Sequence, residues 1–513
     1  MPRLQEPRQF IGLFLGPLLF FGTGFGLQIS GLAAAASWAA ATVALMSCWW
    51  ITEPIPLWAT ACLPIVTFPV FSGVSFPLVV LQYFDPVNFL FLGGMWIAAC
   101  MEQWGLHRRI ALNIVAKIGT SPRRIVLGFM LATAFITLWI SNTAAAIMMF
   151  PIGMAVLRKF EEQHSRNDEL LQRFGLALML GIAYAASIGG IGTKIGTGTN
   201  LVFVKNSPHP VDFVTWAKIG MPVVLISIPL VWFYLVRFGA KLPDRDFPGG
   251  AQAIHEERAR LRKMNPGEIV ALIAFLTAAF LWIFRKDIEL GAFTLPGWSR
   301  LNPWDWGDLL PLDRWSAPLR NLFTNTGDAA VAMVVAGILF FIPVKRSRPG
   351  APRFALSITS ARRISWGMLV LLGGGFAMAY GIQASGLSNS IAENLAFVGK
   401  LNPLLAGFVV AFIAVGLTEV ASNTATASIL LPILAASAAS LGLEPLPIML
   451  TATMAASFGF MLPAGTPPNA IVYASGYITV PQMARSGFVV DIFGAILVTL
   501  ICYFLAPWAL GLP

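Results

Sequence analysis

The chain has 513 residues, of which 57% are hydrophobic and only 11% are charged, with a formal net charge of +10. Its mean hydropathy is +0.74, whereas soluble domains carry roughly 25% charged residues. The composition therefore excludes a soluble globular domain and indicates a polytopic membrane protein. In such a protein the placement of Lys and Arg matters more than their sum, so the positive charge does not indicate nucleic acid binding.

Membrane-crossing helices need about 20 apolar residues each, and the hydrophobic pattern predicts about eleven of them. A short basic stretch precedes the first one without a clear cleavage site. We therefore expect a retained extra helix over residues 1–30 and no signal peptide. The predicted crossings are 10–28, 34–50, 56–81, 87–103, 174–204, 219–236, 267–284, 327–344, 365–384, 446–474 and 488–510.

Two further apolar segments have ends that favour the same side of the membrane. Basic residues both precede and follow residues 125–157, so both ends of this segment are expected in the cytoplasm. Residues 403–440 are preceded by the single cation Lys400 and followed by LGLEPLP, which carries none, so both ends of this segment are expected outside. A segment that enters and leaves on one side is a re-entrant hairpin, and the sequence thus predicts one inward and one outward hairpin.

The distribution of positive charge also predicts the orientation of the chain. With the N-terminus in the cytoplasm, most of the 34 Lys and Arg residues fall in cytoplasmic segments and the C-terminus lies outside. Residues 241–266 are then expected to form a cytoplasmic linker helix between two halves, and the tryptophan-rich stretch 285–325 is expected along the outer surface. We therefore expect a multi-pass protein of the cell inner (plasma) membrane.

The two predicted hairpins carry the same polar triplet. Residues 140–151 read ISNTAAAIMMFP and residues 421–432 read ASNTATASILLP, so Ser141 and Ser422 are 281 positions apart. Ser, Asn and Thr cap helix N-termini, where free N–H groups and a positive dipole end suit a carboxylate or a sulfate. A single triplet in a membrane segment is more often an interhelical contact, but a repeated one favours a binding site.

A second repeated element follows each hairpin. GIGTKIGTGTNLV (190–202) matches LPAGTPPNAIV (462–472) at an offset of 269, which pairs Asn200 with Asn469. The Gly and Pro residues predict broken helices around 192–200 and 462–469, whose exposed carbonyls suit a hard cation such as Na⁺.

The repeats divide the chain into two related halves, 31–240 and 267–513. Because one hairpin opens inward and the other outward, the halves are expected to have inverted topology. Inverted repeats with interrupted helices are typical of secondary transporters, whose sites form at the midplane from both halves. The chain shows no grouped nucleophile, base and orienting residue, so we expect a transporter and not a membrane enzyme.

The paired triplets, GTPPN, WWITEPIPLWATACLPIVTFPV (49–70) and FLGGMWIAACMEQWGLHRRIAL (91–112) resemble the divalent anion:sodium symporter family of di- and tricarboxylate and sulfate transporters over nearly the whole chain. This resemblance implies a homodimer in which a scaffold holds a moving transport domain, an elevator mechanism, and Na⁺ as the coupling ion. It places one Na⁺ at Thr137, Ser141, Asn142 and Gly196, and another at Thr418, Ala421, Asn423 and Gly465. It places substrate at Asn142, Thr143, Thr197, Asn423, Thr424, Thr466 and Pro467.

One residue departs from the pattern expected of that family. Lys194 lies two residues before Gly196, and a lysine at mid-membrane is costly and functional by default. It could modulate the local charge in place of a sodium ion, bind an anionic substrate, or hold an acid such as Glu419. Alternatively, its ammonium group reaches a membrane border or a wet cavity.

These observations together predict a secondary active transporter that imports a small divalent anion. A C4 dicarboxylate such as succinate, malate or fumarate, coupled to Na⁺, is the favoured cargo. A sodium-independent dicarboxylate exchanger and a sulfate transporter remain alternatives within the same class. The expected partners are the small anion, the lipid bilayer and a second copy of the chain.

Overall fold

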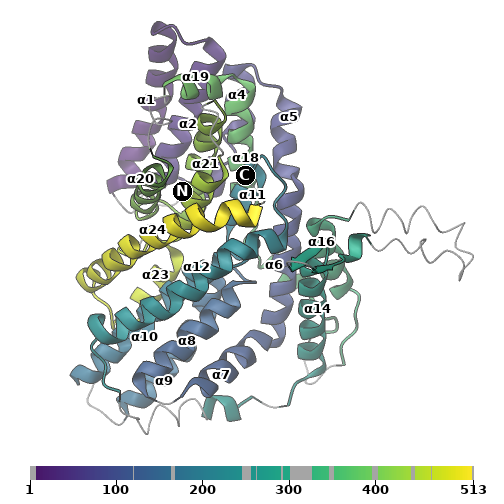
Figure 1. The fold of residues 1–513 in the computed structure, drawn as a ribbon, viewed down its shortest axis with the longest axis vertical. Helices are drawn as coiled ribbons and strands as arrows, with labels where there is room; N and C mark the ends of the chain where they lie inside the picture. The colour runs from purple at the N-terminus through teal and green to yellow at the C-terminus, as the bar shows by residue number, and fades with distance from the viewer. Residues whose placement is uncertain are drawn as a thin grey trace, which may run out of the picture.

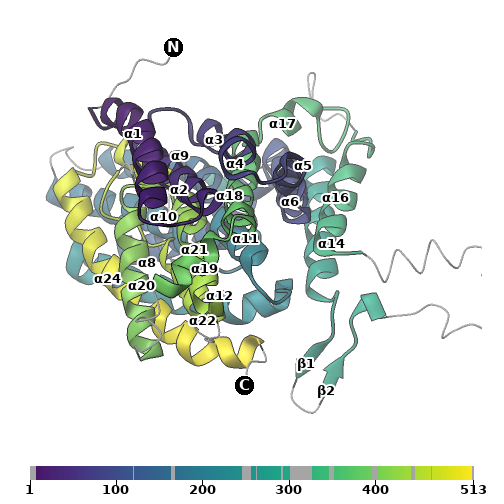
Figure 2. The same ribbon diagram turned by 90° about the horizontal axis from the view of Figure 1, so that it is seen from above.

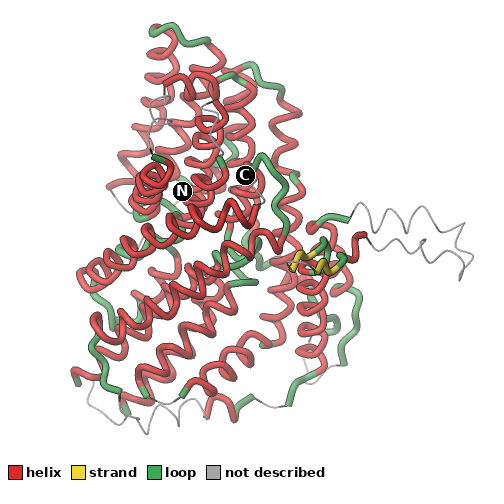
Figure 3. The backbone as a smooth tube through the Cα atoms, in the orientation of Figure 1, coloured by secondary structure: helices red, strands yellow, loops and turns green. Residues whose placement is uncertain are grey.

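The computed structural model describes residues 7–119, 121–162, 168–244, 256–261, 263–290, 293–300, 326–345, 352–394, 402–440, 445–463 and 465–510. Helices dominate this part of the chain (Figure 3). Nine of its helices are long and apolar enough to cross a membrane, and five further apolar helices have 10 to 17 residues. The expected all-α polytopic membrane class is confirmed at this level of detail.

The first half begins with an antiparallel pair, α1 (Pro7–Ile29) and α2 (Ala34–Thr52), joined side by side by the hydrogen bond from Trp49 Nε1 to the Gly12 carbonyl at 2.9 Å. The chain continues through three short helices and a turn of 3₁₀-helix into a long one. These elements are α3 (Leu57–Thr60), α4 (Pro64–Ser72), α5 (Phe76–Leu81), η1 (Gln82–Phe84) and α6 (Pro86–Trp104).

The expected single crossing over 56–81 is therefore wrong. Hydropathy stays high across this stretch, but Pro64 begins a new helix and Gly73, with φ +66°, ends it. Residues Phe76–Trp104 instead form one candidate span of 29 residues, which joins the end of the expected crossing to the next one.

Two helical hairpins and two interrupted helices occupy the regions of the repeated motifs. In the first half the chain forms α7 (Leu106–Ile118), α8 (Pro122–Thr137), α9 (Asn142–Glu161), α10 (Glu169–Gly190), α11 (Gly198–Asn206) and α12 (Phe213–Tyr234), which ends in the π-helical turn η2 (Leu235–Gly239). In the second half it forms α20 (Pro403–Thr418), α21 (Asn423–Ser440), α22 (Leu446–Ala455), α23 (Pro467–Tyr473) and α24 (Val480–Leu510). The expected crossings 174–204 and 446–474 are thus each split into two helices.

The middle of the chain holds α14 (Pro266–Ile283), α16 (Asp328–Leu339), α17 (Ile358–Arg362), α18 (Trp366–Ala384) and α19 (Leu387–Asn394). The sequence did not predict the antiparallel pair β1 (Ile288–Leu290) and β2 (Phe293–Leu295), which precedes the short 3₁₀-helix η3 (Trp298–Arg300). Helix α16 is shorter than the expected crossing 327–344. Of the expected linker helix, residues 256–259 are helical and 245–255 lie outside the described residues, as do residues 301–325 of the tryptophan-rich stretch.

The hairpins and interrupted helices of the two halves interlock. The second arm of the first hairpin, α9, packs on α23, and the second arm of the second hairpin, α21, packs on α11. Helices α12 and α24 pack on each other beside them (Figure 1). The hairpin of each half therefore packs against the interrupted helix of the other half, and the four elements meet at the centre of the molecule.

A separate bundle of three helices flanks this centre. Helices α14 and α16 both pack on α6 and stand with β1 and β2 at the edge of the molecule (Figure 2). At the opposite side α1 exposes large apolar side chains, including Phe10, Phe14 and Leu18. Such a face suits contact with lipid and not with water.

Candidate functional site

The serine of each triplet caps the helix that follows it. Ser141 Oγ accepts a hydrogen bond from the Ala144 N–H at 3.4 Å, and Ser422 Oγ accepts one from the Ala425 N–H at 3.2 Å. Helices α9 and α21 therefore begin at the asparagine of their triplet. The first four N–H groups of a helix have no partner within it, so each helix start keeps donors beyond the one that its serine accepts.

The interruption in each broken helix is a stretch of irregular backbone. Helix α10 ends at Gly190 and α11 begins at Gly198. In the second half α22 ends at Ala455 and α23 begins at Pro467. Irregular backbone in a membrane protein is tolerated only where its polar groups are satisfied by protein or face a wet cavity.

An asparagine side chain ties the first interruption together. Asn200 Nδ2 donates to the carbonyl of Gly190 at 2.9 Å and to that of Thr193 at 2.7 Å, and Asn200 is fully buried. The side chain thus joins the start of α11 to the end of α10 across the gap. We refer to this arrangement as the amide clamp.

The second interruption has the same amide clamp. Asn469 Nδ2 donates to the carbonyls of Gly459 and Leu462, both at 3.0 Å. Donor and acceptors all lie 269 positions after their counterparts in the first half, which is the offset of the sequence repeat. The sequence repeat pairs the two asparagines but does not predict what they do. Their repetition at equal spacing is the signal that indicates a shared structural role.

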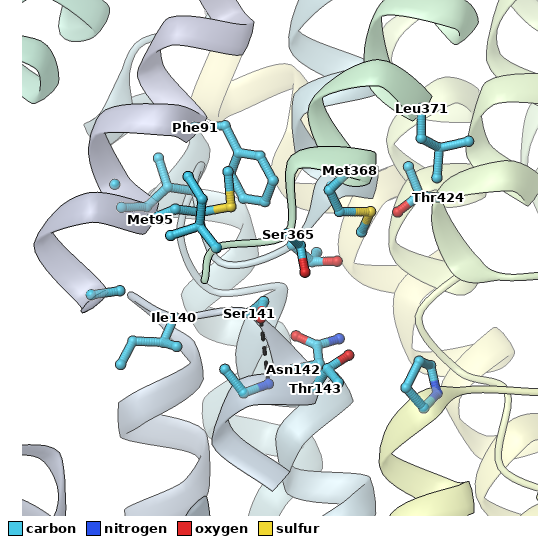
Figure 4. A pocket seen from close by; sticks show the side chains of 18 of the residues that line it. Phe91, Met95, Ile140, Ser141, Asn142, Thr143, Ser365, Met368, Leu371 and Thr424 are labelled. Atoms are coloured by element: carbon cyan, nitrogen blue, oxygen red, sulfur yellow. Dashed lines mark hydrogen bonds between the residues drawn. The ribbon is translucent and has the colours of Figure 1, made fainter. Parts of the chain in front are cut away.

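One cavity of about 430 Å³ lies where the two hairpin tips meet the two interruptions (Figure 4). This volume is within the range of roughly 300–1,000 Å³ found for small-molecule sites. All seven predicted substrate residues line it: Asn142, Thr143, Thr197, Asn423, Thr424, Thr466 and Pro467. The structure therefore brings both halves to one place, and the roles of these residues stay predictions.

The opposite wall of the cavity comes from α6 and α18 and is mostly apolar. Phe91 and Met95 face the hairpin tips from α6, and Met368 and Leu371 from α18 (Figure 4). The cavity thus has a polar side at the helix starts and an apolar side at α6 and α18. A short dianion would fit between them, because its carboxylates can bind the helix starts while its methylene groups contact the apolar wall.

The predicted cation residues divide into two groups. Ser141, Asn142 and Asn423 line the cavity, whereas Thr137, Gly196, Thr418, Ala421 and Gly465 lie outside its lining. The second group thus belongs to the layer of protein behind the cavity, next to the interruptions.

The first cluster of oxygens fits a sodium ion. A Cβ atom placed on Gly190 would lie 2.4 Å from Asn142 Oδ1 and 3.3 Å from the Gly196 carbonyl oxygen, so both oxygens approach Gly190 and Asn142 Oδ1 does so too closely for any residue with a side chain. Asn142 Oδ1 is buried and accepts no hydrogen bond from the described residues. Buried acceptors normally have a partner, and Na⁺ favours neutral oxygen ligands of this kind.

Thr137, which the family resemblance assigns to the first Na⁺, directs its hydroxyl group at its own helix. Its Oγ1 lies 3.0 Å from the carbonyls of both Thr133 and Ala134, to which it donates. Its own carbonyl oxygen would lie 2.8 Å from a Cβ atom on Gly196. The carbonyl of Thr137 is therefore the oxygen that faces the cluster.

The second cluster holds its oxygens in a hydrogen-bonded arrangement. Thr418 Oγ1 donates to Asn423 Oδ1 at 2.8 Å and lies at the same distance from the Ala456 carbonyl. A Cβ atom on Gly465 would lie 3.2 Å from the Glu419 carbonyl oxygen. If the single Thr418 proton is donated to the Ala456 carbonyl instead, Asn423 Oδ1 is free to bind a cation.

A buried carboxylate accepts hydrogen bonds from the backbone of the second interruption. Glu419 accepts hydrogen bonds from the N–H groups of Met461 at 2.9 Å and Leu462 at 3.0 Å. Asp491 of α24, only 2% exposed, accepts one from the Phe460 N–H at 3.4 Å and lies beside Glu419. No local pattern in the sequence indicates this role for Asp491, because it is a lone acid in a long apolar helix.

Lys194 does not line the cavity and does not pair with Glu419. Its Nζ lies 2.8 Å from Asp328 Oδ2 and donates to the Val211 carbonyl at 2.8 Å, with the side chain 8% exposed. The alternative in which Lys194 pairs with an acid is confirmed, but the acid is Asp328 and not Glu419. This partner lies 134 positions away at the start of α16, so no spacing in the sequence indicated it.

The chain is similar to known membrane transporters over nearly its whole length. A family model described as the transmembrane region of sodium:sulfate symporters matches residues 13–510. A sodium-dependent dicarboxylate transporter, SdcS, of Staphylococcus saprophyticus is 38% identical over 512 residues, which cover 98% of this chain and 92% of that protein. The protein of the same name from Staphylococcus aureus is 36% identical over 510 residues, with the same coverage.

A solved structure shares the fold. The crystal structure of the Alcanivorax borkumensis YdaH transporter matches with a TM-score of 0.54 and covers 83% of this chain and 87% of its own. The sequences are 14% identical, so the likeness concerns the fold alone.

Proposed function

Because the chain belongs to the sodium:sulfate symporter family, we propose that it imports a small dianion across the membrane together with Na⁺. The favoured cargo is a C4 dicarboxylate such as succinate, malate or fumarate, since relatives that align over 98% of the chain are named sodium-dependent dicarboxylate transporters. Family membership also confirms the expectation of a transporter and not an enzyme.

One observation carries the proposal more than any other: seven residues from two hairpins and two interruptions meet in a single cavity. Helix starts and hydroxyl groups supply donors for two carboxylates without burying a fixed positive charge. Sodium ions in the adjacent oxygen clusters would supply the charge that balances the dianion. This arrangement explains why a neutral set of side chains can bind an anion selectively with Na⁺.

The proposal extends to the architecture in the membrane. We place an extra helix at 1–30, inverted repeats at 31–240 and 267–513, and a cytoplasmic linker at 241–266. The hairpins would be re-entrant within eleven crossings, with the N-terminus in the cytoplasm and the C-terminus outside. The interlock of α9 with α23 and of α21 with α11 supports a unit that moves as a whole, as an elevator requires.

Two finer points complete the proposal. The two oxygen clusters suggest at least two sodium ions per cycle, one at each interruption. Resemblance to the family further suggests a homodimer, in which the scaffold helices of two copies meet.

The test is the uptake of radiolabelled succinate by proteoliposomes that contain the purified protein. Vesicles receive an inward Na⁺ gradient, a K⁺ gradient in its place, or unlabelled succinate inside. Uptake that requires Na⁺ is expected, and excess unlabelled malate or fumarate should compete with it more strongly than sulfate. Uptake without Na⁺ that requires internal dicarboxylate would replace the symporter with an exchanger, and competition by sulfate alone would identify a sulfate carrier.

A further inference from the structure

Among the described residues, three lysine–aspartate pairs join the first interrupted helix and the start of α12 to the bundle of α6, α14 and α16. They occur within residues 191–213 on one side, and at the ends of the three bundle helices on the other. We call this contact the seam. The pairs are Lys194 with Asp328 at 2.8 Å, Lys205 with Asp85 at 2.5 Å, and Asp212 with Lys286 at 3.4 Å.

The central pair of the seam is deeply buried. Lys194 and Asp328 are 7% and 6% exposed, and Arg285 Nε lies 2.5 Å from the second carboxylate oxygen of Asp328. Trp282 Nε1 donates to the Asp328 carbonyl at 3.0 Å and fixes the start of α16. Removing one partner from such a pair leaves a buried charge without compensation, which is strongly unfavourable.

The two outer pairs are only partly buried and involve helix caps. Asp85 caps α6 through the Val87 N–H at 2.9 Å, and Asp212 caps α12 through the Thr215 N–H at 2.8 Å. Burial by itself would raise the pKa of Asp212, but its hydrogen bonds with Thr215 and the ammonium group of Lys286 hold that pKa below its ordinary value. Each pair thus links the end of one helix to a neighbour across the seam.

The seam and the open part of the cavity lie toward opposite ends of α6. Gly93 packs against Ala332 and Trp96 against Phe340, so α6 and α16 run in the same direction and their first residues lie at one end. The cavity reaches Glu102, 17 residues after Asp85 and about 25 Å further along α6 at 1.5 Å per residue.

At that far end the cavity is accessible. Glu102, Arg363 and Ser365 line it and are exposed. Toward the seam, Ile195 lines the cavity while the neighbouring Lys194 points to Asp328. The same short stretch of backbone therefore forms the closed wall of the cavity and one side of the seam.

We propose that the three pairs form a gate that closes one side of the transporter, and that the gate must open in every transport cycle. The inference rests on the proposed transport function, because alternating access requires the cavity to open on the seam side. Residues 191–213 belong to the unit that carries the substrate site, so its movement past α6, α14 and α16 separates the pairs.

Ion pairs suit such a gate for a physical reason. The attraction within a buried pair is nearly balanced by the desolvation of its charges. When water enters as the seam opens, it solvates both charges, so opening is much less costly than separating the same charges in a dry interior. Apolar side chains in the same place would instead lose stabilisation as water entered.

The test uses the Lys205–Asp85 pair, which is more exposed than Lys194–Asp328 and lies further from the first oxygen cluster. A reporter cysteine replaces Val211, which is 5% exposed, adjoins Asp212 and accepts the hydrogen bond from Lys194 through its carbonyl, in a chain without its native cysteines. The rate of labelling by a membrane-impermeant maleimide is measured in proteoliposomes. The cysteines to be replaced are Cys48, Cys62, Cys100 and Cys502.

We expect Lys205→Gln and Asp85→Asn each to raise the labelling rate at least tenfold. The double reversal Lys205→Asp with Asp85→Lys should return it to within about twofold of the parent. Arg260→Gln, which breaks a pair with Glu257 away from the seam, serves as the matched control and should leave the rate unchanged. Parental labelling rates in both single variants, or a double reversal as fast as the singles, would overturn the gate.

A second measurement covers variants that fold poorly. Cysteines at 205 and 85 in the same cysteine-free chain are joined by a short cleavable bis-thiosulfonate reagent. Succinate uptake should be lost on cross-linking and recovered after reduction, whereas full uptake by the cross-linked protein would refute a moving gate. If the uncross-linked parent takes up no succinate, the proposed function fails, while the labelling result still decides whether the seam opens.

Discussion

Truncation of the first amide clamp, Asn200→Ala, tests whether one side chain holds the interrupted helix in shape. Asn200 is fully buried and donates two hydrogen bonds, at 2.9 and 2.7 Å. The variant leaves the carbonyls of Gly190 and Thr193 without these donors. At about 1–3 kcal/mol for each unsatisfied buried group, the folded state should lose roughly 2–6 kcal/mol.

Sodium binding should weaken as well, because Gly190 borders the first oxygen cluster. The assay follows thermal unfolding of the purified protein in detergent while the Na⁺ concentration is raised. A ligand that binds only the folded state raises the midpoint in proportion to the logarithm of its concentration above its Kd. We expect Asn200→Ala to unfold at a lower temperature and to need at least tenfold more Na⁺ for the same stabilisation.

Asn206→Ala provides the control within the same helix. Asn206 Nδ2 donates to the Val202 carbonyl one turn earlier at 2.8 Å, from a partly buried position. Its loss should change stability by no more than about 0.5 kcal/mol. If Asn200→Ala unfolds at the same temperature as Asn206→Ala and responds to Na⁺ as the parent does, the clamp does not hold the site.

Three further predictions concern the hairpins and the second interruption. Asn142→Ala and Asn423→Ala should each abolish succinate uptake without changing the size-exclusion profile; uptake by the double variant would refute the site. Ser422→Ala removes a helix cap and should cost about 0.5–2 kcal/mol of stability, seen as a lower unfolding midpoint. Asp491→Asn keeps an acceptor for the Phe460 N–H and can donate to Glu419, so its midpoint should equal or exceed that of the parent, whereas Asp491→Leu should lower it.

Local patterns in the sequence predicted which residues meet at the cavity, because helix caps and helix breaks depend on neighbouring residues. A serine cap followed by a helix start, or a glycine that stops a helix, depends on a few neighbouring residues, and each such signal occurs twice at a fixed offset. The seven predicted lining residues therefore fell in one cavity.

Long-range pairing could not be predicted in the same way. The partner of Lys194 depends on how α16 packs beside α6, and no motif marks Asp328 within its own stretch. The break at Gly73 was missed because hydropathy averages over a window, while one residue with positive φ is enough to end a helix. The short β1–β2 pair joins no wider sheet among the described residues and had no periodicity to reveal it.

The amide clamps have a consequence for the energetics of binding. Since Asn200 and Asn469 tie each interruption to its own helix, the irregular backbone keeps its shape without help from a ligand. The proposed site is thus preorganised, and an ion or dianion that binds there would lose little binding free energy to ordering the chain. In the proposed transport cycle the site would then have the same shape when it opens to either side, so the concentration gradients across the membrane, and not a change in intrinsic affinity, would set the direction of transport.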